Sequence, residues 1–445
     1  MSGVAGPGGV AGPGGVAGPG GVAGSGAAVG AASEFQAVVN PLVGAADELQ
    51  VPAGGGTVGA AEVLAFHRRL PGYEPTPLLS APSMAERLGV GSLLLKCESA
   101  RFGLPSFKML GASWATYRAL SERLGEDPEP WSDVHDLARR IAGLRPLSLV
   151  AATDGNHGRA VARMARLLGL GARIFVPEGT SRARIDAIAG DGAEVVVVPG
   201  GYDAAVARSA EDAGPSAVVI SDTSWPGYAD VPRWVIEGYA TMFAEIDDAL
   251  AAGRRGLPDV VVVPIGVGAL AAAAVLHVHR RWGHGGGSGG GGSGGGGSAG
   301  GGSGAGPVVV GVEPADAACA TASALAGKLL TLEGEQRSIM VGLNCGTPSP
   351  VAWPIVSRGV AGFVTIGDEW ARRAVRELAA AGIEAGETGA AALAGVDALH
   401  DEGYGGPLRS LLAPDVSVLV LVTEGVSDLA AWRRILGVEA VGAPA

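Results

Sequence analysis

The stretch Leu147–Leu168, LSLVAATDGNHGRAVARMARLL, joins a predicted strand, a glycine-interrupted turn and a predicted helix. Its first part, Leu147–Ala152, is almost wholly apolar instead of alternating, which predicts a strand buried on both faces. A helical pattern covers His157–Leu168. Because this strand–turn–helix order recurs along the chain, we predict an α/β fold with two doubly wound lobes and mainly parallel sheets.

Other short apolar runs predict further strands. They are Leu93–Cys97, Arg173–Val176, Glu194–Val198, Ala217–Ser221, Val260–Val263, Val308–Val312 and Ser417–Thr423. Helical periodicity between the strands covers, among other stretches, Pro232–Ala252 and Asp368–Ala381. Helices that alternate with buried strands are the expected pattern of parallel sheets.

Glycine makes up 76 of the 445 residues, well above the usual share of about 7%. Much of the excess lies in two tracts. Residues 1–33 contain the repeat VAGPGG, which starts at Val4, and are predicted to form a disordered tail, either a solvated extension or an elastin-like interaction segment. Residues 283–306 contain GGGGS-like units, which predict a flexible inserted surface loop.

Charge and cysteine usage exclude several classes of partner. The net charge is −12 with no basic stripe, so we expect no nucleic acid partner. Three cysteines without CxxC spacing predict neither a metal site nor a disulfide framework, and they suit a cytoplasmic protein. The uncharged run Val260–Val278 has the length of a membrane span, but Pro264, Gly266 and Gly268 interrupt it. We therefore predict a strand, a turn and a helix there, with no membrane association.

The chain holds only three lysines. Lys108 lies in PSFKMLGASWA, where apolar neighbours would lower the amine pKa and make a better nucleophile. The alternative is a lysine that extends its ammonium from a helix start into water. Lys96 is interpreted as the end of a strand, and Lys328 as an exposed residue.

Three turns follow predicted strands and could face a common ligand. The first is Thr153–Gly158, the second is Ile265–Ala269 (IGVGA), and the third is Thr423–Gly425. Backbone N–H groups at such strand-to-helix turns bind anions, and α/β proteins hold ligands at this edge of the sheet. A helix cap or an ordinary turn remains the alternative for each.

Nine segments, in this order, resemble the fold type II pyridoxal-phosphate (PLP) enzymes, the tryptophan-synthase-β family, and within them the diaminopropionate ammonia-lyases. They are Ala65–Leu78, Glu98–Ala115, Ala152–Ala162, Ser221–Tyr228, Gly266–Leu270, Val312–Ala320, Val341–Ile355, Glu387–Leu393 and Thr423–Gly425. The resemblance implies a large PLP-binding domain over 34–110 and 231–445, a small domain over 111–230, and a homodimer.

The resemblance also assigns PLP contacts. Lys108 matches the lysine that forms the internal aldimine, and Asn156 matches the asparagine beside the 3-hydroxyl. Thr423 falls where the family places a hydroxyl near the pyridine nitrogen. The phosphate loop matches Gly266, Val267, Gly268 and Ala269.

The reaction implied is α,β-elimination of 2,3-diaminopropionate, through an aminoacrylate, to pyruvate and two ammonia. Lys108 would remove the Cα proton of the L-isomer, and Asp154 that of the D-isomer, while Asp222 matches a carboxylate associated with the amino end of the substrate. A serine- or threonine-dehydratase-like lyase is the alternative, as is a catalytically idle homologue.

Two further features bear on substrate range and redox behaviour. Asn344 stands where the family has a small residue, and Glu387-Thr388-Gly389 stands where it usually has a serine. Cys319 and Cys345 match family cysteines, which could form a redox-sensitive pair or remain buried thiols.

Overall fold

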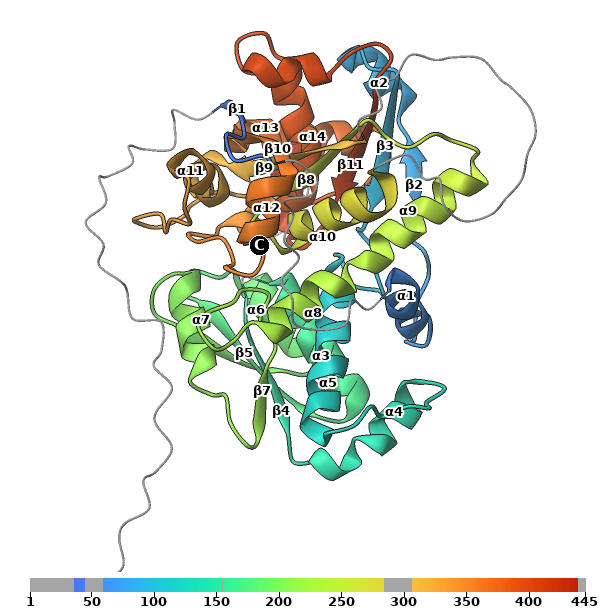
Figure 1. Ribbon diagram of the computed structural model, residues 1–445. Coiled ribbons are helices and arrows are strands. Elements are labelled where there is room, and N and C mark those ends of the chain that lie inside the picture. Colours follow the sequence, from blue (N-terminus) through green and yellow to red (C-terminus); the bar gives the residue numbers. More distant parts are fainter. Residues whose placement is uncertain (1–35, 45–58, 154, 284–305, 439–445) are drawn as a thin grey trace, which may run out of the picture.

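The computed structural model describes residues 36–44, 59–153, 155–283 and 306–438. The glycine-rich tail and nearly all of the Gly/Ser tract lie outside these ranges, as does Asp154. Within them the chain forms two sheets, one in the upper and one in the lower half of Figure 1.

The larger sheet has seven strands in the order β1-β10-β9-β8-β11-β3-β2. Its five central strands run parallel, and the edge strands β1 and β2 pair antiparallel to their neighbours. The bounds are β1 Ala37–Val39, β2 Leu78–Ser80, β3 Ser92–Cys97, β8 Val260–Pro264, β9 Val308–Pro314, β10 Val360–Ile366 and β11 Ser417–Val422.

The smaller sheet has four parallel strands in the order β6-β5-β4-β7. Its strands are β4 Ser148–Ala152, β5 Gly171–Pro177, β6 Glu194–Val198 and β7 Ala217–Val219. The predicted α/β class with mainly parallel sheets is therefore confirmed.

Helices cover both faces of each sheet. They are α1 Ala60–Arg68, α2 Pro82–Leu88, α3 Lys108–Leu124, α4 Val134–Arg140, α5 Asn156–Leu168, α6 Arg182–Gly190, α7 Tyr202–Ala210, α8 Asp230–Gly238, α9 Ala240–Ala252, α10 Ala269–His277, α11 Cys319–Ala326, α12 Trp353–Gly359, α13 Asp368–Ala380, α14 Glu387–His400 and α15 Leu429–Leu436.

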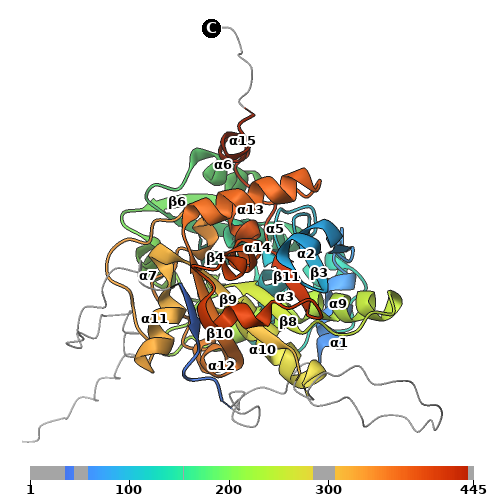
Figure 2. The ribbon, with the colours of Figure 1, turned by 90° about the horizontal axis from the view of Figure 1, so that it is seen from above.

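Alternate residues of β8 belong to separate hydrophobic cores. Val261 and Val263 pack with residues of α10 and α12, whereas Val260 and Val262 pack with residues of α13 and α14. Figure 2 shows these two helix pairs on opposite sides of the larger sheet. A strand buried on both faces needs apolar residues throughout, which is why β8 is a run of valines.

The structure corrects some predicted elements. The predicted helix Pro232–Ala252 is two helices, α8 and α9, which meet at Tyr239. At this break a Cβ on Gly238 would lie 2.5 Å from the carbonyl oxygen of Leu110, so α8 approaches α3 closely. Strands β1, β2 and β10 were not predicted. The first two have only three residues each, and β10 is interrupted by a register shift between Val360 and Gly362.

The uncharged run Val260–Val278 forms β8, a glycine-containing loop and α10, as predicted. Across the described ranges, the helices lack the combination of length and apolar character that crossing a membrane would need.

Candidate active site

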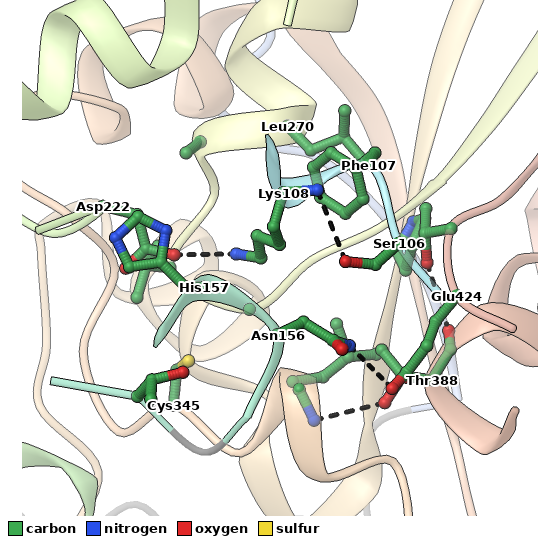
Figure 3. A pocket seen from close by; sticks show the side chains of 18 of the residues that line it. Ser106, Phe107, Lys108, Asn156, His157, Asp222, Leu270, Cys345, Thr388 and Glu424 are labelled. Carbon is green, nitrogen blue, oxygen red and sulfur yellow. Dashed lines mark hydrogen bonds and ion pairs between the residues drawn. The ribbon is translucent and has the colours of Figure 1, made fainter. Parts of the chain in front are cut away.

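A pocket lies where the carboxyl ends of strands from both sheets meet. Strand ends β4, β8 and β11 contribute to its wall, as do the first turns of α3, α5 and α10. Its lining includes Ser106, Phe107, Lys108, Thr153, Asn156, His157, Tyr202, Asp222, Gly266, Val267, Gly268, Ala269, Gly342, Cys345, Thr388, Thr423 and Glu424. Figure 3 shows many of these side chains converging on one space.

Lys108 starts α3 and pairs with Asp222, which follows β7. Lys108 Nζ donates to Asp222 Oδ2 at 2.7 Å, and the lysine side chain keeps 21% exposure while that of Asp222 keeps 6%. The amine therefore sits within the pocket, held by a carboxylate from the other sheet. The alternative of a lysine that reaches away into solvent is wrong.

The environment of Asp222 keeps it ionised. Burial by itself would raise the pKa of Asp222, but the nearby Lys108 and His157 and a hydrogen bond donated by Tyr202 hold it well below its usual range. The Tyr202 hydroxyl donates to Asp222 Oδ1 at 3.1 Å. An ionised, buried carboxylate is suited to attract a cationic group in the pocket.

His157 forms another part of the same wall. Its Nε2 contacts the carbonyl oxygen of Ile220 at 2.7 Å, so Nε2 carries the proton in the neutral ring. Burial lowers the pKa of His157. Its Nδ1 is buried and has no hydrogen-bond partner among the described residues. His157 therefore carries a buried acceptor atom within the wall of the pocket.

The loop Gly266–Ala269 joins β8 to α10 and lines the pocket. Gly268 is the N-cap of α10, with φ +94°. Because glycine has no side chain, it leaves the first N–H groups of the helix uncapped. A Cβ on Gly266 would lie 3.2 Å from both Cys345 Sγ and the carbonyl oxygen of Gly342. Glycines thus keep the backbone close to the pocket, where the first N–H groups of the helix have no helical acceptor. Such a cradle fits the phosphate of PLP.

Asn156 begins α5 and faces Glu424, which follows β11. Asn156 Nδ2 donates to Glu424 Oε1 at 2.7 Å, and Figure 3 shows the two side chains pointing toward one another. This contact is a second link between the two sheets at the pocket. Together with Lys108 and the glycine loop, the polar groups present fit PLP.

Thr423 and Thr388 stand side by side at another part of the wall. The Thr423 hydroxyl donates to the carbonyl oxygen of Thr388 at 3.5 Å, and the Thr388 hydroxyl accepts from the N–H of Gly342 at 3.2 Å. Thr423 is 1% exposed. Both residues line the pocket, and both belong to segments that carry the family resemblance.

The structure gathers in one pocket all the described residues that were predicted for the site. These are Lys108, Asn156, Asp222, Gly266, Val267, Gly268, Ala269 and Thr423. Asp154 lies outside the described residues. Ser106, His157, Tyr202 and Glu424 also line the pocket, although none of them was assigned a role from the sequence. His157 and Glu424 lie in the turns Thr153–Gly158 and Thr423–Gly425, which were expected to face a ligand, so adjacency to Asn156 and Thr423 was the available signal.

Lys96 lies at the end of a strand, as predicted, since it is the penultimate residue of β3. It is also 1% exposed, and its Nζ contacts Glu245 Oε2 at 2.7 Å, which was not predicted. Arg101 and Glu98 complete this buried cluster, with Arg101 contacting both glutamates. Because β3 leads into the segment before Lys108, the cluster anchors the chain that delivers the amine. Lys328 is exposed, as predicted.

All three cysteines of the chain are buried, and the structure holds none of them in a disulfide. Cys345 lines the pocket, and Cys319 Sγ lies 3.8 Å from the carbonyl oxygen of Gly266. Burial raises the pKa of Cys319 well above its usual value. The arrangement matches the predicted alternative of buried thiols.

Known proteins resemble the chain over most of its length. Residues 69–418 match the family described as pyridoxal-phosphate dependent enzymes. A diaminopropionate ammonia-lyase from Escherichia coli strain K12 is 34% identical over 381 residues, covering 83% of this chain and 89% of that protein.

Solved structures show the same similarity. The structure of diaminopropionate ammonia lyase from Escherichia coli in complex with D-serine superposes with a TM-score of 0.76 at 29% identity, covering 91% of this chain and 97% of that one. A structure of the same enzyme in complex with an aminoacrylate-PLP azomethine reaction intermediate gives a TM-score of 0.72 at 29% identity and the same coverage.

Proposed function

The chain belongs to the pyridoxal-phosphate-dependent enzymes, and from that premise we propose that it eliminates ammonia from 2,3-diaminopropionate. The products are pyruvate and two molecules of ammonia. The observation that carries this function is the ion pair of Lys108 with Asp222 in a pocket that also contains a glycine loop. The similar Escherichia coli enzyme, whose solved structure contains an aminoacrylate-PLP intermediate, supports the same reaction.

The chain's own residues divide the work of holding PLP. Gly266, Val267, Gly268 and Ala269 would hold its phosphate through backbone N–H groups at the start of α10. Asn156 would contact its 3-hydroxyl, Thr423 its pyridine nitrogen, and Lys108 would link to it covalently. When bound, PLP supplies an electron sink for the bond broken at the substrate α-carbon.

Lys108 and Asp222 would handle protons and charge. Lys108 Nζ, once released from the cofactor, would take the Cα proton of the L-isomer. Asp222, which is ionised and buried, would attract the second ammonium of the substrate. Loss of that amine as ammonia leaves 2-aminoacrylate, which adds water and loses a second ammonia to give pyruvate. We assign the D-isomer's proton to Asp154 from the family resemblance.

A dehydratase acting on serine or threonine is the alternative function. Its substrates carry one ammonium, whereas the buried carboxylate of Asp222 supplies a partner for a second. The pocket therefore favours the diamine.

The test is an assay of the purified, PLP-loaded protein with 2,3-diaminopropionate, serine and threonine. We expect two ammonia per pyruvate, and turnover mainly of the diamine. One ammonia per pyruvate, produced from serine faster than from the diamine, would instead establish the dehydratase. Assays of the separate D- and L-isomers extend the test to Asp154.

We also propose the division into a small domain over 111–230 and a large domain over 34–110 and 231–445. The four-stranded sheet falls wholly within the first range, which supports it. A homodimer follows from the family resemblance, and cytoplasmic localisation from the buried cysteines held outside disulfides. Light scattering of the purified protein and fractionation of its host cells test these two proposals.

A further inference from the structure

Glu424 occupies a rigid position at the end of β11. Its carbonyl oxygen accepts from the N–H of Gly386 at 3.1 Å, and the next residue, Gly425, donates its N–H to Pro105 at 2.8 Å. Glu424 also forms an isolated antiparallel bridge with Ser106. Its backbone is therefore held between the start of α14 and the segment that leads into Lys108.

The packing around this backbone is close. A Cβ placed on Gly389 would lie 1.9 Å from the carbonyl oxygen of Glu424, so only glycine allows α14 to approach β11 there. Glu424 itself is 2% exposed. The direction in which its side chain leaves β11 is consequently set by the surrounding backbone.

That side chain crosses to the smaller sheet. Glu424 Oε1 accepts from Asn156 Nδ2 at 2.7 Å, and the two residues are 268 positions apart in the chain. A carboxylate oxygen accepts while an amide nitrogen donates, so the contact determines which end of the amide faces Glu424. The Asn156 oxygen and its second N–H hydrogen remain for other contacts in the pocket.

A buried carboxylate needs hydrogen-bond donors to offset the loss of its contacts with water. Leaving such a group without a donor costs more free energy than losing a neutral hydrogen bond, so the Glu424–Asn156 contact resists exchange. Glu387 lies in the same region, and burial together with the charge of Glu424 raises the pKa of Glu387. Asn156 is the side-chain donor that the described residues offer to the Glu424 carboxylate.

We propose that Glu424 is a positioning residue, which fixes the Asn156 amide from across the inter-sheet pocket so that Asn156 presents one orientation to the cofactor. The inference rests on the proposed function, because it assumes that Asn156 contacts PLP. Glu424 acts through Asn156 and through the relative placement of the two sheets.

The test is a double-mutant cycle on PLP binding. Apoprotein of the wild type, Glu424→Ala, Asn156→Ala and the double variant is titrated with PLP, and the visible absorption of the bound cofactor is recorded against pH. We expect each single variant to raise the PLP Kd about tenfold and to change the pH dependence of the absorption in the same way. The double variant should show no further loss, since both changes remove one coupled interaction.

Two more variants separate positioning from general damage. Glu424→Gln keeps the size of the side chain and one accepting oxygen, so its Kd should rise less than about threefold. Glu387→Gln alters a neighbouring buried carboxylate, whereas Asn156 Nδ2 donates to Glu424, so the PLP Kd of this variant should stay within about twofold of the wild type. Circular dichroism and thermal melting check that each variant is folded.

Independent effects of the two alanine changes, giving about a hundredfold loss in the double variant, would overturn the positioning role. An unchanged PLP Kd and absorption spectrum in Glu424→Ala would also overturn it, as would an unchanged PLP Kd and spectrum in Asn156→Ala. In these cases the wild type still binds PLP and the proposed function stands. Failure of the wild-type apoprotein to bind PLP would contradict both.

Discussion

Lys108 Nζ lies 2.7 Å from Asp222 Oδ2, so the first residue of α3 is paired with a carboxylate that follows β7 of the smaller sheet. Lys108→Ala should remove the amine that links to PLP and should lower kcat about 1,000-fold or more. Borohydride reduction followed by peptide mass spectrometry should find PLP on Lys108 in the wild type. Lys328→Ala, at an exposed position, is the control and should behave like the wild type.

Asp222→Asn should weaken recognition of the second ammonium group. The variant keeps the size of the side chain but removes its charge, and a hydrogen bond to a charged group contributes about 1.5–3 kcal/mol. We therefore expect kcat/KM for 2,3-diaminopropionate to fall about 10- to 100-fold, with a smaller effect on any turnover of serine. An equal decrease of kcat/KM for 2,3-diaminopropionate and for serine would show that Asp222 does not select the diamine.

Gly268→Ala should weaken PLP binding. Gly268 has φ +94°, a conformation that costs an alanine about 1 kcal/mol or more, and it is the residue directly before α10 in the glycine loop. Gly327, with φ +69° and open space around it, ends α11 outside the pocket. Gly327→Ala should cost a similar free energy of unfolding and leave the PLP Kd unchanged. Equal PLP affinities in the two variants would exclude a role for the Gly268 loop.

Glu245→Gln should destabilise the fold strongly. Glu245 Oε2 lies 2.7 Å from Lys96 Nζ and Glu245 Oε1 lies 2.6 Å from Arg101 Nη1, with all these side chains at most 3% exposed. Removing one partner of a buried ion pair costs about 3–5 kcal/mol, measurable by urea unfolding. The exposed pair of Arg182 with Asp186 is the comparison. Asp186→Asn should cost less than about 1 kcal/mol, and similar losses in both variants would contradict the assigned role of burial.

The free energy of unfolding should decrease as the pH falls below 6.5, in part because of His67. Burial lowers the pKa of His67 to about 3 from its usual 6.5. Between these values the unfolded state binds a proton that the folded state does not, so His67 favours folding fully above pH 6.5 and loses this effect toward pH 3. In His67→Gln the change of the free energy of unfolding with pH, between pH 6.5 and 5, should be smaller than in the wild type by up to about 1.4 kcal/mol per pH unit. An unchanged slope would exclude His67 as the titrating group.

Much of the fold could be predicted because its strands are apolar on both faces and its turns contain glycine. The elements β8 and α10 are the clearest case, since Gly266 and Gly268 mark the turn between them. The short edge strands β1 and β2 lack such a pattern. The break between α8 and α9 escaped prediction because the helical periodicity continues past Tyr239, and the close approach of Gly238 to α3 at this point is a tertiary contact that periodicity does not report.

The sequence by itself determined the strand–turn–helix units and singled out Lys108, Asn156 and the Gly266–Ala269 loop, because periodicity, glycine and the scarcity of lysine are local properties. Tertiary structure decided the partners. Lys108 and Asp222 are 114 positions apart, Asn156 and Glu424 are 268 apart, and Lys96 and Glu245 are 149 apart. The first two contacts join segments that follow strands of different sheets, and the third joins β3 to α9. Only tertiary packing brings such residues within hydrogen-bond distance, and no local pattern encodes which distant side chain will satisfy a buried charge.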